Sequence, residues 1–204
     1  MRARPYPVII IAFAAATLTG CVDLPPVGAP LQAAVANRID GEAREDADAS
    51  LERLVLSHMR DAILDGNRMH GAAHELDHFE NGYRGRSPSG ALFLSEPELG
   101  RISGLTGGSV TTLDYETDPA SGRISAHGRW ALKEFELDVE EDVITVKRRF
   151  CSDTYRRRSP NSDVFVGATS CYQSGIYGSY LRVPHAFLRR PAGEQVVFLS
   201  AFLL

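Results

Sequence analysis

The sequence predicts an α+β fold, in which two N-terminal helices are followed by an antiparallel β-sheet or small barrel with one disulfide. Three observations support this class. Apolar residues recur at helical spacing up to residue 80, short alternating runs follow residue 90, and two cysteines flank a turn in the second half. A series of helices followed by a series of strands is typical of α+β proteins. The composition, 44% hydrophobic and 24% charged residues with a net charge of −4, is ordinary for a globular protein.

We expect the two helices within residues 47–80. Ser50 or Asp48 is available as an N-cap for the first helix. Gly66-Asn67 interrupts the pattern, and a second, shorter helix is expected from Arg68 to about Phe79. The residues at helical spacing are Leu51, Leu54, Val55, His58, Ala62 and Ile63.

We expect strands over residues 91–204, which complete a single domain that begins at residue 47. Turn residues separate several of the runs, notably at Asp118–Gly122 and Arg190–Gly193. The last run is almost entirely apolar, so it is expected to be a central strand buried on both faces. The runs are Ala91–Ser95, Val110–Glu116, Arg123–Trp130, Phe135–Val139, Val143–Phe150, Val164–Thr169, Ile176–Val183 and Val196–Leu204.

The N-terminus is built like a secretory signal. Arg2 and Arg4 precede the apolar run Val8–Ala16, which is too short for a stable membrane span. The segment ends in Leu18-Thr19-Gly20-Cys21, which resembles the lipobox of bacterial lipoproteins. The resemblance implies that residues 1–20 are a signal peptide and that Cys21 carries the lipid. The alternatives are an ordinary signal peptide with a chance cysteine, or an uncleaved anchor.

Residues 21–46 are expected to form a flexible tether, because they are rich in proline, small residues and acids. The lipobox resemblance implies a protein of the bacterial cell envelope that is attached to a membrane outside the cytoplasm. In lipoproteins held at the inner membrane, Asp typically follows the lipidated cysteine directly. Here Val22 comes first and Asp23 second, which favours the periplasmic face of the outer membrane.

Lipidation of Cys21 leaves Cys151 and Cys171 as a pair in an oxidising compartment. Asn161 lies midway between them within the turn-forming segment Ser159–Asp163. In a hairpin that turns there, the two cysteines face each other across the strands, at the separation a disulfide needs. Closing a loop of about 20 residues stabilises the fold by roughly 3 kcal/mol. The alternative is two unpaired buried thiols.

Charge is distributed unevenly. Acids outnumber bases between residues 40 and 80, and the balance reverses between residues 147 and 190. A basic surface near a membrane attracts anionic lipid head groups or other envelope polyanions; the alternative is a solvated face paired with the acidic segment. No nucleic-acid partner is expected for an exported protein. The candidate anionic-ligand surface comprises Lys147, Arg148, Arg149, Arg156, Arg157 and Arg158.

The segment His74-Glu75-Leu76-Asp77-His78 matches the H-E-x-x-H pattern of zinc metallopeptidases. On a helix, His74 and His78 share a face and bind one Zn²⁺, while Glu75 acts as general base. Against this interpretation stand the charged residue at the fourth position, the lack of a clear third ligand, and strands that follow rather than precede the motif. Weak metal binding and no metal role are the alternatives, and no cofactor is expected in the preferred interpretation.

The region around the cysteine pair resembles the C-terminal domain of the bacterial 17-kDa surface-antigen lipoproteins. The resemblance lies in the turn Asp118–Gly122, in Phe150-Cys151 with Tyr155 nearby, and in Gly167–Cys171. The glycine-zipper segment of that family is missing, and the chain continues well past the second cysteine. The resemblance covers about a third of the chain and implies a non-enzymatic envelope role.

Together these observations predict a lipid-anchored, non-enzymatic envelope protein with a binding or scaffolding role. Its partner would be another envelope protein, peptidoglycan or anionic lipid. The alternative is a membrane-tethered zinc metallopeptidase that uses His74, Glu75 and His78. A third possibility, a periplasmic module for a small ligand, requires a concave and largely apolar pocket.

Overall fold

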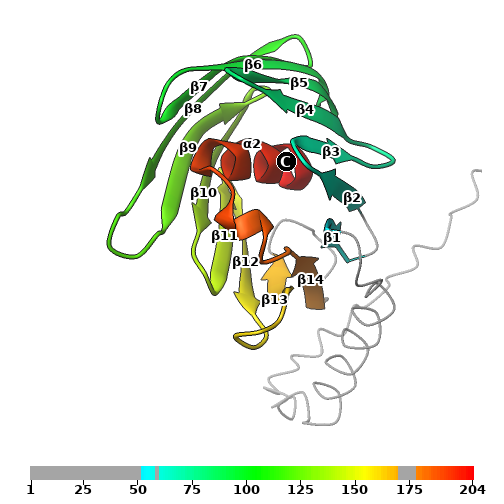
Figure 1. Ribbon diagram of the computed structural model, residues 1–204, viewed down its shortest axis with the longest axis vertical. Coiled ribbons are helices and arrows are strands. Elements are labelled where there is room, and N and C mark those ends of the chain that lie inside the picture. Colours follow the sequence, from blue (N-terminus) through cyan, green and yellow to red (C-terminus); the bar gives the residue numbers. More distant parts are fainter. Residues whose placement is uncertain (1–51, 58–59, 170–177) are drawn as a thin grey trace, which may run out of the picture.

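The fold is a closed antiparallel barrel wrapped around a helix, as a computed structural model of the chain shows (Figure 1). The structure describes residues 52–57, 60–169 and 178–204. In these residues fourteen strands follow one another around the barrel, each pairs with its neighbours in sequence, and the first pairs with the last. The strands are β1 Glu52–Leu56, β2 Arg60–Asp65, β3 Arg68–His70, β4 Glu75–Phe79, β5 Gly82–Ser87, β6 Gly90–Glu98, β7 Arg101–Thr106, β8 Ser109–Thr117, β9 Ile124–Trp130, β10 Lys133–Val139, β11 Val143–Arg148, β12 Cys151–Arg157, β13 Val164–Thr169 and β14 Gly178–Arg182.

Two helical elements follow the strands. A short 3₁₀-helix, η1 (Phe187–Arg189), leads into the helix α2 (Ala192–Leu203). Every residue of α2 from Gly193 onwards is buried, including Glu194, Gln195 and Ser200. Within the described part of the chain, neither element has the length and apolar character that a membrane-crossing helix needs.

The predicted α+β class is wrong, because the described residues between 52 and 80 form strands and not two helices. Leu54 and Leu56 alternate along β1, and Ala62 and Leu64 alternate along β2, so all four side chains enter the core. Val55 points to the opposite face and is also buried, against Tyr180. Because β1 is buried on both faces, Leu54, Val55 and Leu56 are all apolar. Together with the apolar residues of β2 they match a helical spacing, although the segment is extended.

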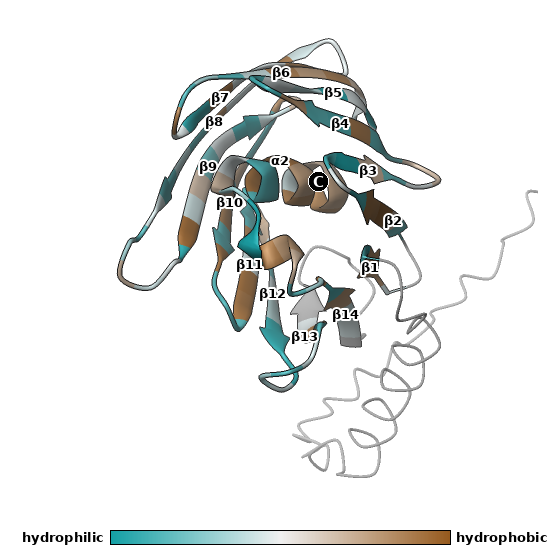
Figure 2. Cartoon of the chain, viewed as in Figure 1, coloured by the Kyte–Doolittle hydropathy of each residue, from teal (hydrophilic) through white to brown (hydrophobic). Residues whose placement is uncertain are grey.

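The expected last strand, Val196–Leu204, is also wrong, because this run forms most of α2. Figures 1 and 2 show α2 inside the barrel, with apolar residues over most of its length. The interior of a barrel widens with strand number, and side chains alone fill it only up to about eight strands. Fourteen strands therefore need a central element, and α2 supplies it. Apolar side chains from both sources form one core, with Leu92, Leu113, Ile144, Phe198 and Phe202 among its members.

A glycine in three alternate strands allows the sheet to curve tightly. Gly85 in β5, Gly104 in β7 and Gly128 in β9 all have positive φ, between 149° and 156°. A Cβ atom built on Gly128 would lie 2.1 Å from the backbone oxygen of Thr112 on β8. The two backbones approach this closely only because no side chain separates them, and such kinks help a sheet to close.

Charged side chains hold both ends of α2. At its C-terminus, Arg60, Lys133 and Arg148 donate hydrogen bonds to the carbonyl oxygens of Phe202, Leu204 and Leu203, respectively. These carbonyls have no partner within the helix, and cations there also complement the helix dipole. We call this end of the barrel the C-end and the opposite end the N-end.

At the N-end, carboxylates face the start of α2. Glu96 accepts hydrogen bonds from the hydroxyls of Tyr83 and Tyr115, and its Oε2 atom lies 2.7 Å from an ideal Cβ position on Gly193. Glu194 pairs with Arg190, and its Oε2 lies 3.3 Å from His78 Nδ1. Anionic groups near a helix N-terminus are favourable, so the two ends together hold α2 in one orientation.

Candidate anion-binding groove

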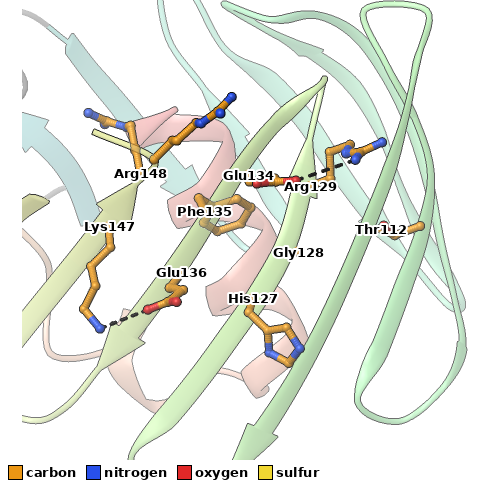
Figure 3. A pocket seen from close by; sticks show the side chains of 10 residues that line it. Thr112, His127, Gly128, Arg129, Glu134, Phe135, Glu136, Lys147 and Arg148 are labelled. Carbon is orange, nitrogen blue, oxygen red and sulfur yellow. Dashed lines mark hydrogen bonds and ion pairs between the residues drawn. The ribbon is translucent and has the colours of Figure 1, made fainter. Parts of the chain in front are cut away.

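The outer face of β8–β11 carries a groove with a volume of about 800 Å³ (Figure 3). Apart from Phe135, Gly128 and Arg148, its lining side chains point outward from the sheet and are exposed. A volume of this size fits a small organic ligand or a lipid head group. The lining residues are Thr112, His127, Gly128, Arg129, Glu134, Phe135, Glu136, Lys147, Arg148 and Arg149.

Strand register places opposite charges side by side across the groove. Arg129 on β9 pairs with Glu134 on β10, and Glu136 on β10 lies between His127 on β9 and Lys147 on β11. Side chains directly opposite each other on one face of an antiparallel pair interact. The groove therefore has an ordered row of charges, visible in Figure 3 as the pairs Lys147–Glu136 and Arg129–Glu134.

The groove has an excess of cations. Lys147 Nζ lies 2.9 Å from Glu136, and this hydrogen bond is the main cause that raises the lysine pKa. Arg129 lies 3.7 Å from Glu134. Exposed pairs of this kind contribute about 0–1 kcal/mol, so an incoming anion can replace either carboxylate at small cost. In the described part of the chain no carboxylate pairs with Arg149, whose guanidinium lies over the exposed ring of Phe150.

The structure divides the predicted basic surface into four groups. Lys147 and Arg149 point into the groove. Arg148 lies at the groove edge, but its guanidinium turns inward to Asp153 and to the last turn of α2. Arg157 is almost fully buried and donates hydrogen bonds to backbone oxygens of Glu141 and Ser162. Arg156 and Arg158 line no part of the groove.

The helical geometry assumed for the H-E-x-x-H motif is not formed. Glu75 and His78 lie in β4, with His74 directly before it. Along an extended strand, positions i and i+4 are about 13 Å apart, much too far for two imidazoles to share an ion. His74 contacts the ring of Phe202 at the C-end, whereas His78 stacks on Tyr83 at the N-end. Glu75 pairs with Arg68 on the outer face.

Among the described residues, no three or more His, Cys, Asp or Glu side chains are arranged to hold a metal ion. His74 is 1% exposed, and burial together with the charge of Arg60 lowers its pKa to about 4. The imidazole is therefore neutral at neutral pH and packs as part of the core. The polar groups at the N-end are likewise engaged: Glu96 holds Tyr83 and Tyr115, and burial raises the pKa of Tyr115 to about 12.

Four predicted features lie wholly or partly outside the described residues. The signal peptide over residues 1–20, the lipidation site Cys21 and the tether over residues 21–46 lie wholly outside them. The Cys151–Cys171 bridge lies partly outside, because Cys151 begins β12 and Cys171 is not described. The pairs between β12 and β13, from Arg157–Phe165 to Asp153–Thr169, are symmetric about Asn161, as the hairpin prediction requires. The disulfide itself stays a prediction.

Sequence reasoning did not identify Arg129 and His127 as part of a site. Their signal was present, since His127, Arg129 and Ser125 alternate with apolar Ala126 and Trp130 and so occupy the solvent face of one strand. Only the register with β10 and β11 shows that they lie on the same face as Lys147, with Glu136 between His127 and Lys147. In comparisons with known proteins, no family model, no curated protein and no solved structure matches this chain.

Proposed function

We propose that this protein is a lipid-anchored, non-enzymatic component of the bacterial envelope that binds a phosphate-bearing ligand in the groove on β8–β11. The observation that carries the proposal is the groove itself, with Arg129, Lys147 and Arg149 facing Glu134 and Glu136. Guanidinium and ammonium groups that lie close together favour phosphate oxygens. The lipobox resemblance at Cys21 supplies the location.

The filled interior supports a role for the outer surface. Proteins that carry apolar ligands inside a barrel need an empty, largely apolar cavity. Here the side chains of α2 occupy that space, and Val196, Val197, Phe198 and Leu199 are all fully buried. The residues that line the groove lie on strands β8–β11, except Arg149, which lies in the turn after β11. Sites on strands keep their geometry more closely than sites on loops.

The test is calorimetric titration of the full chain with sodium pyrophosphate at low salt. Reversing two groove charges, in Lys147→Glu/Arg149→Glu, is expected to weaken binding at least tenfold. The matched control is Arg101→Glu/Arg156→Glu, which makes the same change in net charge on strands outside the groove. Equal loss of binding in both double variants would show a general effect of net charge and would refute the groove. The intact mass of the purified protein separately tests acylation at Cys21.

A further inference from the structure

Two hairpin tips at the C-end each present a large apolar residue to solvent. Leu132 lies in the two-residue turn between β9 and β10 and is 72% exposed, and Phe150 lies in the turn between β11 and β12 and is 88% exposed. β10 pairs with β11, with Phe135 opposite Arg148 close to both turns. The two tips are therefore neighbours on the same end of the barrel.

The backbone at one tip is in an unfavourable conformation for its residues. Ala131 and Leu132 have φ values of +47° and +74°. Two-residue hairpin turns with positive φ at both positions normally use Asn, Asp or Gly, because other side chains are strained there. The chain thus holds a leucine in solvent at a position where both burial and conformation disfavour it. Backbone strain of this kind concentrates at functional positions.

A row of exposed apolar residues crosses the outer face beside these tips. Phe93 on β6 pairs with Leu105 on β7, and Leu105 pairs with Val110 on β8. All three point outward, and about half of each side chain is exposed. One residue pair, Thr106–Ser109, separates Leu105 and Val110 from the Gly107-Gly108 turn at the C-end, so the row lies near that end. We call the tips and this row together the rim.

The rim is bordered by cations. Arg84 lies opposite Phe93 on the neighbouring strand, and Lys133 and Arg149 adjoin the two tips. The exposed cations around the rim are Arg84, Arg86, Arg129, Lys133 and Arg149, against the carboxylates Glu75, opposite Arg86, and Glu134. Most turns at the N-end carry acids, at Glu80, Glu98, Asp118, Glu140, Glu141 and Asp142, although Arg123, Arg158 and the exposed Leu99 also lie in turns at that end.

We propose that the rim docks on an anionic lipid bilayer, with Leu132 and Phe150 inserted among the head groups and the surrounding Arg side chains bound to lipid phosphates. Apolar and aromatic side chains flanked by cations are what the interface of an anionic membrane accepts. The acidic turns of the N-end then face away from the membrane. This inference rests on the proposed envelope location. On it, the phosphate groups near the groove belong to lipids of the membrane on which the rim docks.

The proposed lipid anchor is compatible with this orientation. The chain enters the barrel at Glu52, where β1 begins at the N-end, and about 30 residues separate it from Cys21. A segment of that length reaches up to about 100 Å when extended, which exceeds the length of a seven-residue strand several times over. The anchor and the rim can therefore contact one membrane together.

The experiment is hydrogen–deuterium exchange of the full acylated chain in three settings: detergent micelles, phosphatidylcholine vesicles, and vesicles that contain phosphatidylglycerol. The amides at residues 131–133 and 149–150 are expected to exchange about tenfold more slowly on phosphatidylglycerol vesicles than in detergent. The turn at residues 118–123 is the internal control and is expected to be unchanged. Burial of one leucine or phenylalanine corresponds to about tenfold or more in an equilibrium constant, so Leu132→Asn/Phe150→Ser is expected to abolish the protection.

Each other outcome overturns the proposal in a defined way. Equal exchange on all three supports would show that the rim stays in solvent. Equal protection on both kinds of vesicle would show insertion without a requirement for anionic lipid. Protection that rises with protein concentration in the absence of vesicles would show that a second copy of the chain covers the rim. Leu132 does not line the groove, whereas Phe150 carries the guanidinium of Arg149, so pyrophosphate binding by Leu132→Asn alone separates a failure of the rim from a failure of the groove.

Discussion

Acidification from pH 7.5 to pH 5 is expected to lower the free energy of unfolding by about 2 kcal/mol through His74 alone. Burial lowers the pKa of this imidazole from 6.5 to about 4, with Arg60 adding to the effect and Ala201 and Asp61 opposing it. Between pH 6.5 and pH 4 the imidazole of residue 74 is protonated in the unfolded chain and stays neutral in the folded chain. Stability is therefore complete above pH 6.5 and is lost as the pH falls towards 4. The full loss corresponds to about 3 kcal/mol.

The assay is urea denaturation at pH 7.5 and pH 5, followed by circular dichroism, on the natural chain and on His74→Leu. The two proteins differ only at residue 74, so the contributions of all other groups cancel in the difference between the two pH dependences. His74→Leu is expected to lose about 2 kcal/mol less than the natural chain over this range. His127→Gln, at an exposed position on β9, is the control and is expected to behave like the natural chain. Identical pH dependence in His74→Leu and the natural chain would refute the reasoning.

Two further predictions concern the backbone. Leu132→Asn is expected to raise the free energy of unfolding by about 1 kcal/mol, because Asn tolerates positive φ better than Leu does; a fall in the urea midpoint would contradict this. Gly128→Ala is expected to destabilise the barrel by about 2–3 kcal/mol, since its Cβ meets the Thr112 backbone oxygen. Gly122 also has positive φ but has open space around it, so Gly122→Ala is the control and is expected to lower the free energy of unfolding by only about 1 kcal/mol. Equal losses of stability in the two variants, measured by thermal unfolding, would exclude the contact with Thr112 as the cause.

Seven of the runs predicted after residue 90 coincide with strands, because their alternation is simple, whereas β7 and β12 were not predicted. In β8, Val110 is exposed and Thr111, Leu113 and Tyr115 are buried, with a polar residue between each buried pair. The same regularity marks β9, β10 and β11. Alternation is a direct consequence of one buried face, so it can be read without knowledge of the partner strands.

The two ends of the barrel chain were assigned wrongly for related reasons. β1 is buried on both faces, so Leu54, Val55 and Leu56 form a continuous apolar run with no period of two. α2 is enclosed on all sides, so it has no polar face and no helical period. Periodicity reports a boundary between core and solvent, and segments without such a boundary cannot be classified by it.

The candidate groove was predictable only in part. The cluster around Lys147 and Arg149 is visible in the sequence as a run of bases. Arg157, from the same basic region, instead donates hydrogen bonds to the backbone oxygens of Glu141 and Ser162. Which cations stay available for a ligand depends on contacts between distant residues, and the sequence holds no local record of those contacts.

The position of α2 after all fourteen strands has a consequence for the order of folding. No strand can complete the burial of its inner face until this last segment has been synthesised, and the β1–β14 pairing also needs the final part of the chain. Partial chains consequently have strands with unpaired edges and no core to collapse on, which delays cooperative folding until late. For a protein exported as we propose, this delay is an advantage. A chain that cannot fold early stays unfolded while it crosses the membrane, and it reaches its stable fold only after export.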